Sequence, residues 1–232
     1  EKLETKWTKH PILHLDLNTA KYDSRESLNE ILNKKLLEWE SVYGTGLGET
    51  SLSLRFLGIV QRACEKTGNR VVILVDEYDK PMLQSIGNPE LQEKFRNTLK
   101  AFYSVLKTQD RYIKLAFLTG VTKFGKVSVF SDLNNLEDIS MDERYIDICG
   151  ITEQELHDYF DEGVAALGEK NGMSKEECYD KLKEMYDGYH FRRNCIGLYN
   201  PFSLLNALAK REFSNYWFET GTPSFLVELL KQ

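Results

Sequence analysis

Ten residues, VVILVDEYDK at positions 71 to 80, place five aliphatic side chains directly before three carboxylates. The aliphatic run is mostly β-branched and does not alternate with polar residues, so it predicts a central strand of a parallel sheet that is covered on both faces. Charges at the end of such a strand must be paired, bound to a metal or solvated. In open α/β sheets, ligands bind at the carboxyl ends of the strands. Asp76, Glu77 and Asp79 are therefore the first candidates for a functional site.

Two other stretches predict strands, PILHLDL at residues 11 to 17 and IKLAFLT at residues 113 to 119. Helical patterns with an apolar stripe lie between the strands: one is capped by Ser24 and broken at GTGLGE, one ends at Gly68, and one runs from Asn88-Pro89 to Leu106. Helical connections of this length favour parallel neighbours. The order of elements therefore predicts an α/β fold built on a parallel sheet.

The pattern changes to helices after about residue 150. Thr152 with Glu155, and Ser174 with Glu177, have the spacing of capping boxes, and Asn200-Pro201 and Thr222-Pro223 predict two further helix starts. We therefore predict two domains, an α/β core over residues 1–150 and a helical subdomain over residues 151–232.

Composition narrows the classes of function. The formal net charge of -6 argues against a surface devoted to nucleic acid, which usually carries a basic excess; a local basic patch is still compatible with this charge, so nucleic acid is a possible partner that the composition does not indicate. No apolar run approaches the roughly 20 residues of a membrane span, and no signal peptide is recognisable. The four cysteines are widely spaced without a CxxC pair, which favours reduced thiols. We expect a cytoplasmic protein with no membrane association.

Aliphatic residues followed by Asp-Glu are typical of the Walker B strand of a nucleoside triphosphatase. The first acid, here Asp76, would hold Mg²⁺ through water, and the second, here Glu77, would activate the attacking water. Adjacent strand residues point to opposite sides, so both acids can serve one substrate only if the chain turns at this point. The alternative is structural, because acids at strand ends also cap neighbouring helices or pair with lysines.

The strand at 113 to 119 ends in Thr119, and Thr122 and Lys123 follow closely. ATPases related to the AAA class use a polar residue on the strand beside Walker B to sense the γ-phosphate. The competing explanation is a hydroxyl satisfied by the next turn, which is frequent for threonine.

Taken in order, several segments of the chain closely resemble the bacterial AAA-ATPase-like family, a family of P-loop NTPases. They are WTKHPILHLDL (7–17), VVILVDEYDKP (71–81), FLTGVTKFGKVSVFSDLNNLEDIS (117–140), CGITEQEL (149–156), YDGYHF (186–191), YNPFSLLNAL (199–208) and YWFETGTPSFLVELL (216–230). The resemblance therefore spans nearly the whole chain.

This resemblance implies an ATP-binding P-loop core of the ASCE division, a helical region after it, and often a nuclease-like domain of the PD-(D/E)XK type further downstream. It also implies Mg²⁺ and ATP as cofactor and ligand. By the family motif, Asp76 is the metal residue, Glu77 the catalytic base and Thr119 the sensor. Thr122 and Lys123 lie beside the sensor as nucleotide-binding residues. The intact parent would hydrolyse ATP and pass a conformational change to the C-terminal helices.

One family element is absent from the sequence, the Walker A motif G-x-x-x-x-G-K-[ST]. GTGLGETS, residues 44 to 51, is rich in glycine, but it lacks the lysine and does not follow an apolar strand. GVTKFGK, residues 120 to 126, follows a strand but has Val127 where Ser or Thr should bind Mg²⁺. Together with the absence of an initiator Met, this predicts a truncated fragment that binds nucleotide poorly.

Without the Walker A strand, the three predicted strands should form a contiguous parallel sheet. Its exposed edge would invite pairing with a protein partner or a second copy. A non-catalytic interaction or regulatory module that retains the NTPase fold is the alternative function. Nuclease activity within this chain is disfavoured, because VDEYDK lacks the Glu-x-Lys spacing of such sites.

Overall fold

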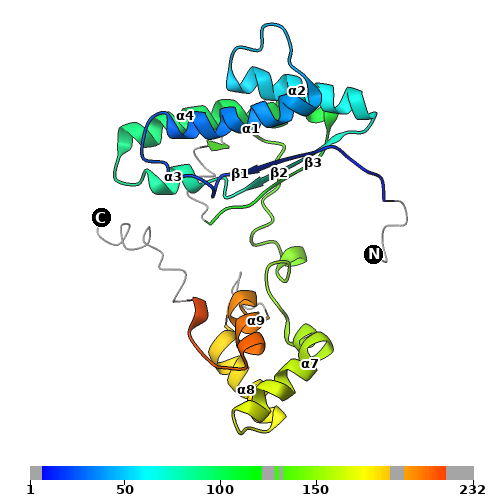
Figure 1. Ribbon diagram of the computed structural model, residues 1–232, viewed down its shortest axis with the longest axis vertical. Coiled ribbons are helices and arrows are strands. Elements are labelled where there is room, and N and C mark those ends of the chain that lie inside the picture. Colours follow the sequence, from blue (N-terminus) through cyan, green and yellow to red (C-terminus); the bar gives the residue numbers. More distant parts are fainter. Residues whose placement is uncertain (1–6, 122–128, 131–132, 189–195, 218–232) are drawn as a thin grey trace. The chain divides into compact units, whose positions relative to one another are not determined.

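The computed structural model describes residues 7–121, 129–130, 133–188 and 196–217 (Figure 1). Within these ranges the chain divides into two compact units, the first reaching Leu136 and the second starting at Glu137. Each unit encloses its own hydrophobic core. The division of the whole chain into domains at residue 150 stays a prediction.

Three parallel strands form the sheet of the first unit: β1 (Ile12–Asp16), β2 (Val71–Asp76) and β3 (Ile113–Leu118). Their order in space is β1-β2-β3. The predicted α/β class and the contiguous parallel sheet are therefore confirmed. The register pairs Asp16 with Asp76 and Val75 with Leu118, so the carboxyl ends of all three strands meet at one edge.

Helices α1 (Ser27–Tyr43), α2 (Leu52–Thr67) and α4 (Pro89–Tyr103) cover one face of this sheet (Figure 1). The remaining connections contain α3 (Lys80–Gln84), α5 (Val105–Thr108) and the 3-10 turn η1 (Asp110–Tyr112). The side chains between helices and sheet are fully buried, among them Leu13, Leu15, Leu32, Leu36, Ile59, Val60, Val71, Ile73, Phe95 and Leu99. Each such side chain contributes about 1.5–3 kcal/mol on burial, which makes this interface the main source of stability of the unit.

Local capping signals fix the ends of α2 and α4. The Ser51 hydroxyl accepts a hydrogen bond from the N–H of Leu54 at 3.2 Å, and α2 ends at Gly68, whose φ of 69° suits a residue without Cβ. Asn88 caps α4 by accepting from the N–H of Leu91. These boundaries agree with the sequence prediction.

Two boundary predictions were wrong in detail. Ser24 was predicted to cap α1, but the helix begins three residues later, at Ser27, with Glu26 in the capping position; the Ser24 Oγ still accepts from the N–H of Ser27 at 3.2 Å. The helix expected to continue to Leu106 ends at Tyr103, and α5 begins at Val105.

The second face of the sheet differs from the prediction that β2 is covered on both sides. On this face Ile12, Leu115 and Phe117 are 57%, 52% and 39% exposed, whereas Val72 and Leu74 are partly buried. The register places Val72 between Ile12 and Leu115, so the flanking strands shield the middle one. Among the described residues, helical cover is therefore found on one face only.

The second unit is helical, as predicted. It contains the 3-10 turn η2 (Glu143–Tyr145) and helices α7 (Glu153–Lys170), α8 (Lys175–Tyr186) and α9 (Pro201–Lys210). Both predicted capping boxes are present, with side chain and backbone bonded reciprocally in each, and Asn200 caps α9. The start predicted at Thr222-Pro223 lies outside the described residues. Within the ranges given above, no helix combines the length and apolar character needed to cross a membrane.

Candidate functional site

Polar residues from the ends of the three strands lie together at the carboxyl edge of the sheet. Asp16 ends β1 and is paired in register with Asp76 at the end of β2, and Thr119 directly follows β3. The ladder continues past the strands, because the N–H of Thr119 donates to the carbonyl of Val75 at 2.9 Å. The parallel arrangement thus brings residues more than 100 positions apart to one edge.

Asp76 and Thr119 are in direct contact. The Thr119 hydroxyl donates a hydrogen bond to Oδ1 of Asp76, and both side chains are exposed. The structure therefore brings together the residues that the sequence assigned to the metal and to the sensor. Their carboxylate and hydroxyl remain accessible to a ligand from solvent.

Glu77 lies at the point where the chain leaves the sheet. Its φ is 56°, a left-handed conformation that is uncommon for a residue other than glycine, so the chain turns here as the two-acid arrangement requires. Its Oε2 is buried and has no hydrogen-bond partner in the described part of the chain. Burial raises the pKa of Glu77; Lys80 opposes this shift, whereas the nearby charges of Asp79, Asp76 and Asp16 add to it.

The loops after β2 and β3 are joined by two further contacts. The N–H of Tyr78 donates to the carbonyl of Thr119 at 2.9 Å, and Oδ1 of Asp79 accepts from the N–H of Val121 at 3.2 Å. Asp79 is fully buried. From the sequence, Asp79 was only one of three neighbouring carboxylates. No local pattern predicted its contact with Val121, 42 residues away.

Asp16 also lies at this candidate site, although it was not among the residues predicted from the sequence. PILHLDL turns polar at Asp16, and in a parallel sheet this position falls beside the end of β2. That alignment was the available signal. Thr122 and Lys123, which were assigned to nucleotide binding, lie outside the described residues, as does most of the GVTKFGK segment.

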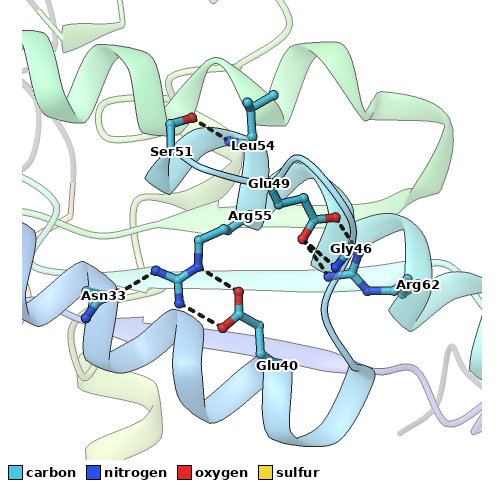
Figure 2. Close-up of polar contacts among 8 residues, drawn as sticks. All are labelled: Asn33, Glu40, Gly46, Glu49, Ser51, Leu54, Arg55 and Arg62. Carbon is cyan, nitrogen blue, oxygen red and sulfur yellow. Dashed lines mark hydrogen bonds and ion pairs between the residues drawn. The ribbon is translucent and has the colours of Figure 1, made fainter.

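The glycine-rich loop at 44 to 51 connects α1 to α2 and binds one of its own carboxylates (Figure 2). The N–H of Gly46 donates to Oε2 of Glu49 at 3.2 Å, and the Arg62 guanidinium pairs with both oxygens of the same carboxylate. The Gly46 amide and the Arg62 guanidinium are thus bonded to Glu49. The loop follows a helix and not a strand, as the sequence indicated.

A second ion pair joins helices α1 and α2 directly. Arg55 on α2 donates through two nitrogens to Glu40 on α1, and its remaining nitrogen reaches Asn33 (Figure 2). The hydrogen bond from Arg55 lowers the pKa of Glu40 despite the opposing effect of burial. Bidentate pairs of this kind fix orientation as well as charge, and they give this network a structural role.

The donor set at the sheet edge is compatible with Mg²⁺. Among the described residues, no three His, Cys, Asp or Glu side chains gather into a metal-binding group. Mg²⁺ in phosphate-binding sites is typically held by one or two carboxylates, with waters and phosphate oxygens as the other ligands. An exposed carboxylate beside a hydroxyl, as at Asp76 and Thr119, fits that kind of site.

Fold and site together define an α/β protein whose acidic and hydroxyl side chains lie where open parallel sheets bind their ligands. The sequence matches the family described as "Predicted AAA-ATPase" over residues 1–130, and the chain belongs to this family. The resemblance seen in the motifs is thereby confirmed.

A relative is known from Azotobacter chroococcum mcd 1, where it is named "Uncharacterized protein in vnfD 5'region". It is 39% identical to this chain over 227 residues, which are 97% of this chain and 42% of that relative. The chain thus spans about two-fifths of the length of the relative it matches. No solved structure gives a significant match.

Proposed function

We propose that this AAA-ATPase-like domain binds MgATP at the carboxyl edge of its sheet and hydrolyses it within the intact natural protein. The observation that carries the proposal is the contact between Thr119 and Asp76 at the end of the strand that leads into Glu77. A carboxylate for the metal, a second for the water and a hydroxyl on the neighbouring strand are the groups that ATP hydrolysis needs at this edge.

Asp76 is the residue we assign to the metal. Its exposed carboxylate would hold the ion through water, and the Thr119 hydroxyl would keep that carboxylate oriented by donating to Oδ1. Mg²⁺, when bound, neutralises negative charge on the phosphate oxygens, which phosphoryl transfer to water requires.

Glu77 is the residue we assign as general base. A base is most effective when its pKa lies near the working pH, and burial shifts the pKa of Glu77 upward in that direction. Its buried Oε2 needs a hydrogen-bond partner, which an ordered water would supply. Left-handed backbone at a residue other than glycine is also concentrated at functional sites, which supports the assignment of Glu77.

Phosphate binding requires more than the residues described. The sequence has no Gly-Lys-Ser P-loop, and the loop at 44 to 51 is committed to Glu49. We therefore expect the 232-residue chain alone to bind nucleotide weakly, because backbone N–H groups and the lysine of a P-loop normally make the strongest phosphate contacts. Thr122 and Lys123 are proposed as additional nucleotide contacts.

The test is MgATP binding and hydrolysis by the intact natural protein, beside its Asp76→Asn and Glu77→Gln variants. Glu93→Gln, on an exposed position of α4, is the matched control for removing a carboxylate. We expect Glu77→Gln to bind ATP but lose at least about 100-fold in turnover, and Asp76→Asn to need more Mg²⁺. If the natural protein neither binds nor hydrolyses ATP, the proposal fails and a non-catalytic interaction or regulatory module is the better description.

A further inference from the structure

Asp79 differs from the other acids of VDEYD in being completely buried, although it lies only three positions after exposed Asp76. A buried carboxylate needs hydrogen bonds that replace those of water. Asp79 precedes α3, yet its side chain makes no capping bond to that helix. Its Oδ1 instead accepts from the N–H of Val121, in the loop that follows β3.

Gly120 makes this contact sterically feasible. A Cβ atom at position 120 would lie 2.6 Å from Cε1 of Tyr78 and 2.7 Å from Oδ1 of Asp79, which is closer than such atoms can approach. The Tyr78 ring also packs against Phe130, with ring centres 5.0 Å apart. The backbone of the loop after β3 therefore packs directly against Tyr78 and Asp79.

The contacts between the two loops surround the proposed catalytic groups. Tyr78 and Asp79 hold the backbone at Thr119 and Val121, and the Thr119 side chain bonds Asp76. Glu77 lies between Asp76 and Tyr78 in the sequence, so a contact to residue 119 is made on each side of it along the chain. Any movement of residues 119 to 121 would therefore displace the hydroxyl of Thr119 from Asp76.

We propose that Asp79 is a positioning residue that fixes residues 119–121 against the end of β2, so that Thr119 stays on Asp76. The consequence for turnover rests on the function proposed above. Because its side chain is buried, Asp79 does not touch substrate. To hold the N–H of Val121, the side chain at position 79 needs an acceptor oxygen. An asparagine at this position retains that oxygen, whereas an alanine does not.

The experiment uses three variants in the full natural protein: Asp79→Ala, Asp79→Asn and Gly120→Ala. Gly120→Ala leaves the buried carboxylate in place but forces the loop away from it, which guards against a folding defect specific to Asp79→Ala. Two quantities are measured for each variant, the hydrogen-exchange rate of the Val121 amide and the kcat and KM for MgATP. Glu77→Gln is the comparison, since it removes the proposed base without touching the loop contact.

We expect Asp79→Ala and Gly120→Ala to speed exchange at Val121 at least about tenfold, because the amide loses its acceptor. The same two variants should lose about tenfold or more in kcat with KM changed less than threefold, and Asp79→Asn should stay within about threefold of wild type in both quantities. Glu77→Gln should lose turnover while its Val121 amide remains protected.

Two results overturn the inference. One is unchanged exchange at Val121 in Asp79→Ala, which would mean that the carboxylate does not hold the loop. The other is an Asp79→Asn variant as inactive as Glu77→Gln, which would mean that the charge itself is required. If the wild type shows no turnover, the proposed function fails, and the exchange rates alone still decide whether Asp79 holds the loop.

Discussion

Thr119 donates its hydroxyl to Oδ1 of Asp76, which joins the ends of β3 and β2 across 43 residues of sequence. Neither residue is buried, so the bond is not needed to satisfy a group removed from water. An exposed hydrogen bond of this kind contributes little to folding. It lies at the carboxyl edge of a parallel sheet, where such folds bind ligands, and this position is the basis of the role proposed for the two residues.

Replacing Thr119 with valine should separate function from stability. Valine keeps the branched shape but removes the donor to Asp76, so we expect MgATP turnover by the natural protein to fall at least about tenfold. The free energy of unfolding should change by less than about 1 kcal/mol, because the residue is exposed. Thr119→Ser, which keeps the hydroxyl, is the control. Equal turnover in Thr119→Val and wild type would show that the hydroxyl has no catalytic role.

Glu77 should make the protein less stable as the pH rises. Its pKa in the folded state is raised above the ordinary value of 4.5, so below pH 4.5 both states carry the proton and there is no penalty. As the pH rises through the raised pKa, the folded state must hold a half-buried charge and stability falls. Glu77→Gln should therefore raise the melting temperature at pH 7 to 8 and leave it nearly unchanged at pH 4.

Thermal unfolding across this pH range, with Glu93→Gln as the exposed control, measures the effect. A Glu77→Gln variant that is no more stable than wild type at pH 7 would show that Glu77 is solvated in solution. It would also remove the argument for Glu77 as a base with an upward-shifted pKa.

The sheet could be predicted from sequence because its signals are local. The aliphatic run of β2 and the apolar stripes of α1, α2 and α4 each determine one element, and long connections between strands allow only a few arrangements. The start of α1 could not be placed as well. Ser24 and Ser27 both offer a hydroxyl near the helix start, and Ser24 bonds the N–H of Ser27 across the turn that leads into the helix.

The proposed site was partly predictable for the same reason. Strand ends in a parallel sheet meet at one edge, so a spacing argument suffices to place Asp76 near Thr119. The contact between Asp79 and Val121 depends instead on how two loops pack, and the close approach at Gly120 leaves no periodic signal. The pairing of Glu49 with Arg62 could not be predicted from the sequence either, because that contact depends on the conformation of an irregular loop.

The Glu40–Arg55 pair should support stability above acidic pH. Arg55 lowers the pKa of Glu40 below its ordinary 4.5, so this contribution is present above pH 4.5 and is lost as the pH falls through the lowered value. Glu40→Gln should cost about 2 kcal/mol at pH 7, because it leaves the largely buried guanidinium of Arg55 without its carboxylate.

Glu38→Gln is the matched control on the same helix. Glu38 pairs with Lys35 but its side chain is 50% exposed, so the change should cost less than about 1 kcal/mol. The free energies of unfolding of the wild type, Glu40→Gln and Glu38→Gln are compared by urea unfolding at pH 7 and pH 4. Similar losses for the two variants at pH 7 would contradict a structural role for the Glu40–Arg55 pair.

Gly58 in α2 should resist a substitution that normally strengthens helices. Alanine is favoured over glycine in a helix interior by about 1 kcal/mol. At position 58, however, a Cβ atom would lie 2.5 Å from Cδ of Glu49 and 2.7 Å from Nη1 of Arg62, so the ion pair would have to move. Because Glu49 and Arg62 are flexible side chains that can shift, we expect Gly58→Ala to cost about 1 kcal/mol or less instead of stabilising the helix.

Gly163 in α7 provides the opposite case, because a Cβ atom there would lie 3.6 Å from Leu208, an ordinary contact distance. Gly163→Ala should therefore stabilise its own unit by about 0.5–1 kcal/mol. A double variant, Gly58→Ala with Glu49→Ala, should recover the normal helix preference, since the clashing carboxylate is gone and the Arg62 side chain, released from it, can move away. If Gly58→Ala by itself stabilises α2 as much as Gly163→Ala stabilises α7, then Glu49 does not lie against α2 in solution, and the glycine-rich loop would be open to bind an external anion.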